Sequence, residues 1–484
     1  MAGDIEIHEH VVIAHPGKAE TAAMSAEALG AKVLHRYGDR VHIVQAGPES
    51  LDVESAAASP AAAEVSESLL AELDEVERLG VMALGLRQSG SYVQAKRNRP
   101  RQGEPWEMYD CTRVGIPPQG SVGAPTRAAG SGAPPTSSYL EGSVAVGIVI
   151  VEGPNANLQF SQQERTKVVA EVQNGLSFYA AQNPAAGLTF TYDIQIIPVT
   201  VQPDPNAPDK EALWRDPAMG ALGFTADWTG VAEYVDDIRN RFGTRWTYCG
   251  FFTKYPLDWF AYASIGGPRL VMQYDNDGWG PDNIDRVFAH ESGHIFGCPD
   301  EYAASNCDCA GQWGRFGRPN GNCQNCAPGG GTSCIMKGND WAMCNWTPSH
   351  LGWVARATGD PVLIQSRFGT QGNFELAMPT SRGLFSLWRN NDDMPALPWN
   401  IGAPAGEELG LVSALSLIQS NFGSPGNLEV VARVGEKLFA FWRDSGPTFT
   451  WNGPTQISAD GVPITGVTGA PVLVQSRCGT QGNL

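Results

Sequence analysis

Two histidines one helical turn apart constrain this chain more than any other feature. Residues 287–302 read VFAHESGHIFGCPDEY. If this segment is helical, His290 and His294 face the same side, and their two imidazoles can bind one metal ion. Glu291 then lies beside a water molecule at that ion, where a carboxylate acts as a general base. The pattern predicts a helix that carries two metal ligands and a catalytic glutamate.

The residues after this helix predict where it ends and which side chain completes the metal site. Gly297 can adopt the left-handed conformation that stops a helix, and Pro299 cannot continue one. The turn brings Asp300, six residues after His294, to the place of a third ligand. Three protein ligands leave the fourth tetrahedral position open for water or substrate. Glu301 is the alternative third ligand, because it also follows the turn.

A second short segment strengthens this interpretation. Residues 334–338 read CIMKG, and Met336 comes 42 residues after His294. The segment resembles the Met-turn, a tight turn that places a methionine under the metal. Together the two motifs make residues 140–355 similar to the metzincin zinc peptidases, and among them to the snapalysins and the immune-inhibitor-A-like peptidases. The resemblance implies a zinc endopeptidase with an α/β catalytic domain, one catalytic Zn²⁺ and a protein or peptide substrate.

The same resemblance indicates how a substrate binds. In metzincins the strand before the metal helix is the sheet edge where an extended substrate pairs, and Leu270, Val271 and Met272 would belong to that edge. The alternative is an ordinary inner strand. Tyr302 either donates a hydrogen bond to the oxyanion or forms part of the wall of the site. His350 is expected to cap or pack rather than to bind the metal.

The cysteines indicate an oxidising environment. Seven of the ten lie within residues 298–344, a segment that is rich in Gly and Asn and has little to pack, so it predicts disulfides. The alternative is a second, structural zinc ion bound by Cys307, Cys309, Cys323 and Cys326. Because seven is odd, at least one of these thiols is free or pairs outside the segment.

Charge and hydropathy exclude two classes of partner. The formal net charge is −18, and an acidic chain lacks the basic face that phosphate contacts need, so we expect no nucleic acid partner. The longest apolar run, residues 144–151, is far too short to span a bilayer, so we expect no membrane partner. Residues 1–20 contain no apolar core of a signal peptide. We expect an extracellular or exported protein whose export route the sequence leaves open.

Shifts in composition predict a multidomain chain. Residues 1–114 read as a small α+β unit that resembles an inhibitory propeptide, and residues 115–142 as a flexible linker rich in Pro, Gly, Ala and Ser. The α/β peptidase domain then occupies residues 143–356, and an all-β region occupies residues 357–484. Cys111 precedes the linker and is a candidate thiolate switch for the zinc, the alternatives being a disulfide or a buried thiol.

Hydrophobic periodicity predicts alternating strands and helices in the first two folded regions. We expect strands at residues 10–14, 32–46 with a turn at 38–39, 144–151, 188–201, 246–253 and 269–274. We expect helices at residues 19–31, 64–79, 161–181 and 231–242, and the metal helix from residue 281.

The C-terminal region contains a repeat. Residues 361–373 read PVLIQSRFGTQGN and return as LSLIQSNFGSPGN at 415–427 and as PVLVQSRCGTQGN at 471–483. Strands that recur every ~50 residues are typical of propeller blades, and these resemble the repeats of bacterial fucose-binding and sialidase-like β-propeller lectins. The resemblance implies glycan binding by an incomplete propeller; the alternative is a structural spacer whose tryptophans pack between blades. For the whole chain the alternative function is a carbohydrate-binding protein with an inactive or accessory peptidase domain.

Overall fold

The computed structural model divides the chain into two compact units, Met1–Trp353 and Val354–Leu484. The residues that it describes are 9–46, 56–59, 62–106, 136–275, 278–314, 317–353, 357–380, 383–397, 399–402, 405–406, 409–446 and 449–476. A membrane-spanning helix needs a long apolar stretch, and none of the helices in these ranges contains one.

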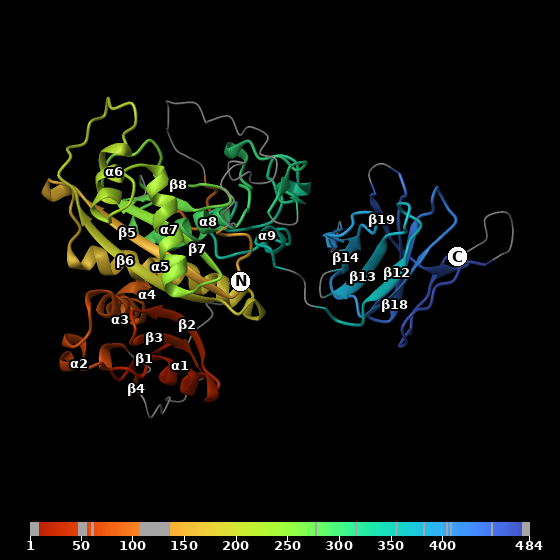
Figure 1. Cartoon of the computed structure of the whole chain (residues 1–484), viewed down its shortest axis with the longest axis horizontal. Coiled ribbons are helices and arrows are strands. Elements are labelled where there is room, and N and C mark those ends of the chain that lie inside the picture. Colours follow the sequence, from red (N-terminus) through yellow and green to blue (C-terminus); the bar gives the residue numbers. More distant parts are fainter. Residues whose placement is uncertain are drawn as a thin grey trace. The chain divides into compact units, whose positions relative to one another are not determined.

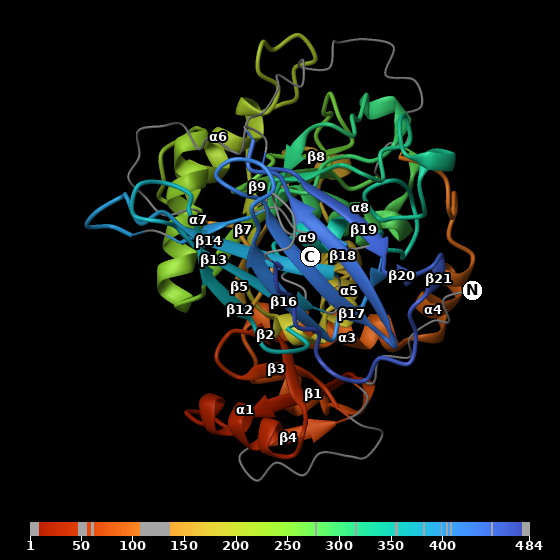
Figure 2. The same ribbon diagram turned by 90° about the vertical axis from the view of Figure 1, so that its right-hand side faces the viewer.

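A nine-stranded mixed sheet forms the centre of the first unit (Figure 1). Its strands are β1 (Glu9–Ala14), β2 (Lys32–Tyr37), β3 (Val41–Gln45), β4 (Ala56–Ser59), β5 (Ser143–Glu152), β6 (Thr189–Pro198), β7 (Trp246–Thr253), β8 (Ala261–Ala263) and β9 (Arg269–Gln273). Their order is β4-β1-β3-β2-β6-β5-β7-β9-β8, and Figure 2 shows them stacked from β4 at the bottom to β8 at the top. The pairs β2-β6, β6-β5, β5-β7 and β7-β9 are parallel. The pairs β4-β1, β1-β3, β3-β2 and β9-β8 are antiparallel.

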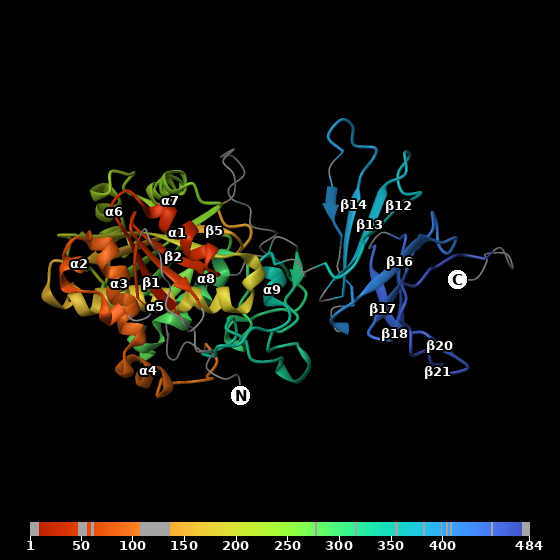
Figure 3. The ribbon, with the colours of Figure 1, turned by 90° about the horizontal axis from the view of Figure 1, so that it is seen from below.

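Helices cover both faces of this sheet. The helices of the unit are α1 (Ala19–Ala28), α2 (Glu67–Ala71), α3 (Glu75–Gln88), α4 (Gly90–Arg97), α5 (Gln162–Gln182), α6 (Ala212–Ala221), α7 (Trp228–Phe242), α8 (Ile284–Ile295) and α9 (Thr347–His350). Helices α3, α5 and α8 pack on one face, and α1, α6 and α7 pack on the other (Figure 3). Strand β5 is therefore buried on both sides, which explains why it reads as an uninterrupted apolar run.

The prediction of a separate N-terminal domain is wrong for residues 9–46, 56–59 and 62–106, the part of that region that the structure describes. Strand β2 pairs in parallel with β6, so the N-terminal strands extend the same sheet and share one hydrophobic core with it. At this junction the ring of Tyr37 stacks on that of Tyr192 with centroids 4.5 Å apart. The side-chain amide of Gln173 donates to the hydroxyl of Tyr37 at 2.8 Å. Local patterns showed the N-terminal strands but not the strand with which they pair.

Most of the predicted elements are confirmed, and the differences have local causes. The helix predicted from residue 161 is α5, which begins with a capping box: the Ser161 hydroxyl accepts from the Glu164 N–H, and the Glu164 carboxylate accepts from the Ser161 N–H. The helical stretch predicted at residues 64–79 is confirmed in part. It is split into α2 and α3 because Asp74 and Glu77 form a second capping box that starts a new helix.

Strand β9, which contains Leu270, Val271 and Met272, is not the edge of the sheet. It lies between β7 and β8, so the alternative of an inner strand is the correct one. Residues 257–263 return the chain antiparallel to β9, and the short strand β8 becomes the edge. The side chains of Leu270, Val271 and Met272 are consequently buried.

The described end of the predicted linker is packed rather than flexible. The N–H of Thr247 donates to the carbonyl of Thr136 at 2.8 Å, and the hydroxyl of Ser137 donates to the carbonyl of Gly266 at 2.8 Å. Leu140 is buried against the same core. The flexible-linker prediction is therefore wrong for residues 136–142, and its remainder, with Cys111, lies outside the described residues.

A buried histidine at the junction between the N-terminal strands and the rest of the sheet makes stability depend on pH. His35 lies 2.7 Å from the Tyr192 hydroxyl through Nδ1 and 3.1 Å from the Ser177 hydroxyl through Nε2. Burial lowers the pKa of His35 from 6.5 to about 3, a fall that Glu9 opposes and Arg87 adds to. His35 is therefore neutral in the folded chain and becomes protonated more readily after unfolding.

We expect this histidine to destabilise the fold in acid. The contribution of neutral His35 to the free energy of unfolding is fully present above pH 6.5. It falls as the pH drops toward 3, by about 1.4 kcal/mol for each pH unit. His35→Gln keeps hydrogen-bonding groups but does not titrate. Thermal unfolding at pH 7 and pH 5 should show a smaller decrease in Tm for the variant than for the wild type. Equal decreases would contradict the assignment.

The second unit consists of two successive four-stranded antiparallel sheets. The first contains β12 (Val362–Gln365), β13 (Phe374–Thr380), β14 (Gly383–Arg389) and β15 (Trp399–Ile401), and the second contains β16 (Ala414–Gln419), β17 (Leu428–Val434), β18 (Lys437–Arg443) and β19 (Trp451–Gln456). A hairpin of β20 (Ser458–Ala459) and β21 (Val462–Pro463) follows. The N–H of Arg367 donates to the Gln419 side chain at 2.6 Å, and the N–H of Asn421 donates to the Gln475 side chain at 2.9 Å. The repeated glutamines thus connect each copy of the repeat to the one before it, while the propeller itself stays a prediction.

Candidate metal centre

Helix α8 carries the predicted histidine pair and is buried along all of its 12 residues. It ends where the sequence predicts, at Gly297, whose φ of +95° lies in the left-handed region. The N–H of Cys298 donates back to the carbonyl of Gly293 at 2.9 Å. A Cβ atom at position 297 would lie 2.8 Å from the Cα of Gly314, so a larger residue would not fit without displacing the backbone. The turn after α8 therefore requires this glycine.

Three side chains converge beside this turn. The Nε2 atoms of His290 and His294 lie 3.1 Å apart. The Oδ1 atom of Asp300 lies 3.2 Å from the first of them and 3.1 Å from the second. These are the three residues predicted from the spacing, and their ligand atoms are close enough to bind one metal ion together.

The hydrogen bonds of the two imidazoles indicate that a cation belongs between these atoms. The Nδ1 of His290 lies 3.0 Å from the carbonyl oxygen of Ile335, and the Nδ1 of His294 lies 2.7 Å from that of Cys298. A neutral imidazole has a single N–H, which these carbonyls accept, so both Nε2 atoms present lone pairs. Two lone pairs and a carboxylate oxygen at these distances repel one another unless a cation lies between them. The three residues therefore fit a metal ion.

Protons and metal ions compete for this site. Burial lowers the pKa of His294, but the charge and hydrogen bond of Asp300, the charge of Glu291 and the Cys298 carbonyl together raise that pKa to about 9. Burial likewise raises the pKa of Asp300, but the two histidines outweigh it and hold that pKa well below its usual value. Metal binding must therefore displace a proton from the histidine pair.

Glu291 lies next to the three convergent side chains but is not one of them. Its side chain is buried, and its Oε2 has no hydrogen-bond partner among the described residues. Burial raises the pKa of Glu291 above 4.5, although both histidines lower it. A buried carboxylate with a free oxygen and a raised pKa suits a group that accepts a proton and then releases it.

Met336 packs against helix α8 at Gly293. It is completely buried, and its Sδ is 2.5 Å from the position that a Cβ on Gly293 would occupy. Gly293 precedes His294 on α8, so a larger residue there would displace the methionine. The carbonyl of Met336 accepts the N–H of Glu301 at 2.9 Å. The turn around Met336 thus supports both the metal helix and the segment that carries Asp300.

Glu301, the alternative third ligand, faces away from the histidines. Its Oε2 accepts the side-chain amide of Asn322 at 2.6 Å, and its Oε1 lies 3.1 Å from the Sγ of Cys344. It belongs to a different group of side chains, so Asp300 is the carboxylate that the structure brings to the histidines.

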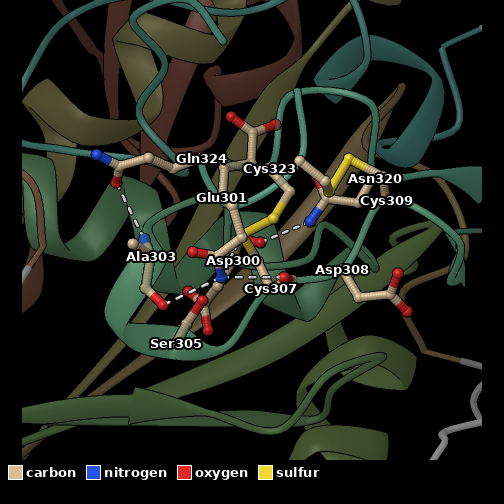
Figure 4. Close-up of a disulfide and its surroundings, with 12 residues drawn as sticks. Asp300, Glu301, Ala303, Ser305, Cys307, Asp308, Cys309, Asn320, Cys323 and Gln324 are labelled. Atoms are coloured by element: carbon tan, nitrogen blue, oxygen red, sulfur yellow. Dashed lines mark hydrogen bonds between the residues drawn. A yellow bond between two sulfur atoms is a disulfide. The ribbon is translucent and has the colours of Figure 1, made fainter. Parts of the chain in front are cut away.

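Two disulfides hold the loop that follows Asp300. They join Cys307 to Cys323 and Cys309 to Cys326, and the loop also contains the short strands β10 (Gln312–Trp313) and β11 (Arg318–Pro319). The four sulfur atoms are paired as the disulfide prediction expects. The ligand atoms of Cys309, Cys323 and Cys326 also lie within 4.8 Å of one another, so the structural zinc ion stays an alternative for the reduced cysteines. Disulfides fit an extracellular location. They also lie close to Asp300, as Figure 4 shows.

Contacts from this loop fix the orientation of the metal-site turn. The Asn320 side-chain amide donates to the carbonyl of Asp300 at 2.7 Å, and the N–H of Gln324 donates to the carbonyl of Glu301 at 2.9 Å (Figure 4). His350 is buried, and its Nε2 lies 3.0 Å from the carbonyl of Pro319. It is the packing residue that the sequence predicts.

A pocket opens beside His290 and Glu291. The other residues that line it are Trp106, Val287, Phe260, Ala261 and Tyr302. Tyr302 is part of this wall, and burial raises the pKa of its hydroxyl well above 10, so it remains protonated and able to donate a hydrogen bond. Trp106, Phe260 and Ala261 lie far from the motif in sequence, and no local pattern marked them.

Comparison of the chain with models of protein families and with curated proteins finds no match to either.

Proposed function

We propose that this chain is a zinc-dependent endopeptidase of the metzincin type. The observation that carries the proposal is the convergence of two imidazole Nε2 atoms and one carboxylate oxygen beside a buried glutamate with an unpaired oxygen. Two histidines and a carboxylate with an open position form the ligand set of many zinc peptidases. His290, His294 and Asp300 would bind the ion.

Each residue of the site then has a defined task. A bound zinc ion polarises a carbonyl group and lowers the pKa of a water molecule. Glu291 accepts a proton from the attacking water on Oε2 and passes it to the leaving amine. The carbonyls of Ile335 and Cys298 keep the two imidazoles in the tautomer that presents Nε2 to the ion. Tyr302 donates to the developing oxyanion from the wall of the pocket.

Strand β8 is the place where we propose that an extended peptide binds. Within the described residues, β8 pairs with β9 on one side and has no strand on the other. Ala261 is the first residue of this strand, and both Ala261 and the preceding Phe260 line the pocket. A peptide that adds to this edge through main-chain hydrogen bonds would run past Glu291 and the metal ligands.

Casein hydrolysis tests the proposal. The purified chain should produce new peptide termini from denatured casein, a zinc chelator should abolish this activity, and added zinc should restore it. Absence of hydrolysis by a folded, zinc-loaded chain would reject the peptidase function. Binding to a glycan array by that same inactive chain would support the alternative, a lectin with an inactive peptidase domain.

The N-terminal segment that ends at Trp106 covers this site, and we propose that it limits access. The N–H of Gly103 donates to the carbonyl of Asn339 at 2.8 Å, and the N–H of Asn339 donates to the carbonyl of Glu104 at 2.8 Å. The indole N–H of Trp106 donates to the carbonyl of Ile335 at 2.6 Å, and its ring lies 5.5 Å from that of His290. The indole thus occupies space directly beside a proposed metal ligand.

Replacing Trp106 tests this role without removing strands that belong to the sheet. Trp106→Ala should increase kcat/KM for a peptide substrate by at least about threefold, because the occluded state no longer competes with substrate. Trp106→Phe is the matched control. It keeps an aromatic ring over the site, loses only the N–H, and should behave like the wild type. An unchanged or lower rate for a folded, zinc-loaded Trp106→Ala variant would show that the indole does not obstruct the site.

A further inference from the structure

A second group of potential metal ligands lies behind the Asp300 turn. It consists of the carboxylate of Glu301 and the thiols of Cys334 and Cys344, whose ligand atoms all lie within 4.8 Å of one another. All three side chains are buried. The two cysteines are not disulfide-bonded in the structure, in contrast to the four cysteines of the neighbouring loop.

Backbone N–H groups surround the sulfur atom of Cys344. The backbone N–H groups of Trp346 and Thr347 both point at this Sγ, at 3.3 and 3.4 Å. Backbone N–H donors around a cysteine sulfur stabilise negative charge on it, as they do for thiolates that bind metals. A disulfide sulfur carries no such charge and gains little from two donors.

The hydroxyl of Thr347 touches every member of the group. Its Oγ1 lies 3.1 Å from the Sγ of Cys334, 3.2 Å from the Sγ of Cys344 and 3.4 Å from the Oε1 of Glu301. A hydroxyl has one hydrogen, so it can donate to only one of these three atoms. The two atoms of the group that do not receive this hydrogen contact the Thr347 oxygen without accepting a hydrogen bond from it.

The buried carboxylate of Glu301 has no compensating cation. Its described partners are the Asn322 amide, the Cys344 thiol and the Thr347 hydroxyl, and no Lys, Arg or His in the described part of the chain forms an ion pair with it. An isolated charge of this kind is expensive to bury unless it is paired or coordinates a metal. Two thiols and a buried carboxyl group thus gather in the described structure without a positively charged side chain on Glu301, and one metal ion between them would supply that charge.

We propose that Glu301, Cys334 and Cys344 bind a second zinc ion with a structural role. Thiolate ligands select soft or borderline ions such as zinc over magnesium or calcium, and Thr347 Oγ1 lies where a fourth donor can complete a tetrahedron. Zinc displaces the protons of the two thiols when it binds. Complete burial leaves no open position for substrate, which is typical of structural zinc sites.

This ion would join the two segments that shape the first site. Glu301 adjoins Asp300 in the chain, and Cys334 adjoins Ile335, whose carbonyl accepts from His290. A metal ion between Glu301 and Cys334 would therefore fix the position of Asp300 relative to the Ile335 carbonyl that orients His290. The proposal concerns metal content and does not depend on peptidase activity.

Zinc content tests the second site. The full chain, supplied with zinc and dialysed, should contain two zinc ions by elemental mass spectrometry. Cys334→Ser and Cys344→Ser should each contain one. The matched control is Cys249→Ser, which replaces another buried free cysteine outside the group and should contain two. One zinc ion in the wild type, or two in a folded Cys344→Ser variant, would overturn the proposal.

Cobalt spectroscopy keeps the test decisive if the cysteine variants fail to fold. The His290→Ala/His294→Ala variant leaves the second group intact and should still show the thiolate-to-cobalt charge-transfer absorption when loaded with Co²⁺. Absence of this absorption would contradict the proposal, as would a Cys334–Cys344 disulfide found by peptide mapping of the unreduced chain. Either result would be independent of whether the chain cleaves peptides.

Discussion

Replacing Glu291 with glutamine is expected to leave zinc bound while peptide turnover falls by at least about 10²-fold, the usual contribution of a positioned general base. Glutamine has the shape of glutamate but cannot accept the proton. Glu291 is not among the three convergent ligand atoms, so their geometry should survive the change. The measurement is kcat on one peptide substrate together with zinc content for the same protein preparation.

The control for this variant is Glu164→Gln. Glu164 belongs to the capping box of α5, and glutamine also serves at that position, so turnover should stay at the wild-type level. If Glu291→Gln retains zinc and turns over substrate at a rate close to the wild type, another residue is the base. If it loses zinc, Glu291 contributes to metal binding rather than to proton transfer alone.

Asp300→Ala is expected to remove the zinc ion of the histidine site and the activity together. Two imidazoles alone bind zinc weakly. The loss of affinity should therefore exceed the ~10–100-fold effect that follows the loss of an outer-shell partner. Asp308→Ala is the matched control, because Asp308 is an exposed carboxylate in the same loop. Zinc titration in the presence of a competing chelator measures both affinities.

The result that would contradict this assignment is equally specific. If Asp300→Ala binds zinc and cleaves substrate as the wild type does, the third ligand is another residue. Glu301→Ala distinguishes the two acidic neighbours. We expect it to lower zinc content through the second site while leaving the histidine site able to bind the ion, because Glu301 faces Cys344 and Asn322 rather than the histidines.

Local spacing was sufficient to predict the metal helix and the turn after it. His290 and His294 meet because they are four residues apart on a helix. Asp300 reaches them because Gly297 turns the chain at once. Met336 was found by its resemblance to a known turn. In each case the signal lies in a short stretch of sequence whose geometry is fixed by backbone sterics.

Contacts between distant segments could not be predicted in this way. The pairing of β2 with β6 joins segments that lie far apart in the sequence, and no local pattern records it. Trp106 reaches the site only because its segment pairs with residues 337–339. The group formed by Glu301, Cys334 and Cys344 was missed for the same reason, since its members come from separate turns.

The position of zinc in a crystal is the most direct test of the histidine site. Diffraction data collected on both sides of the zinc absorption edge locate the ion without reference to activity. We expect an anomalous peak within bonding distance of His290 Nε2, His294 Nε2 and Asp300 Oδ1, with Glu291 beside it but not coordinated. Crystals of the zinc-supplied full chain that show no peak between these three atoms would contradict this expectation.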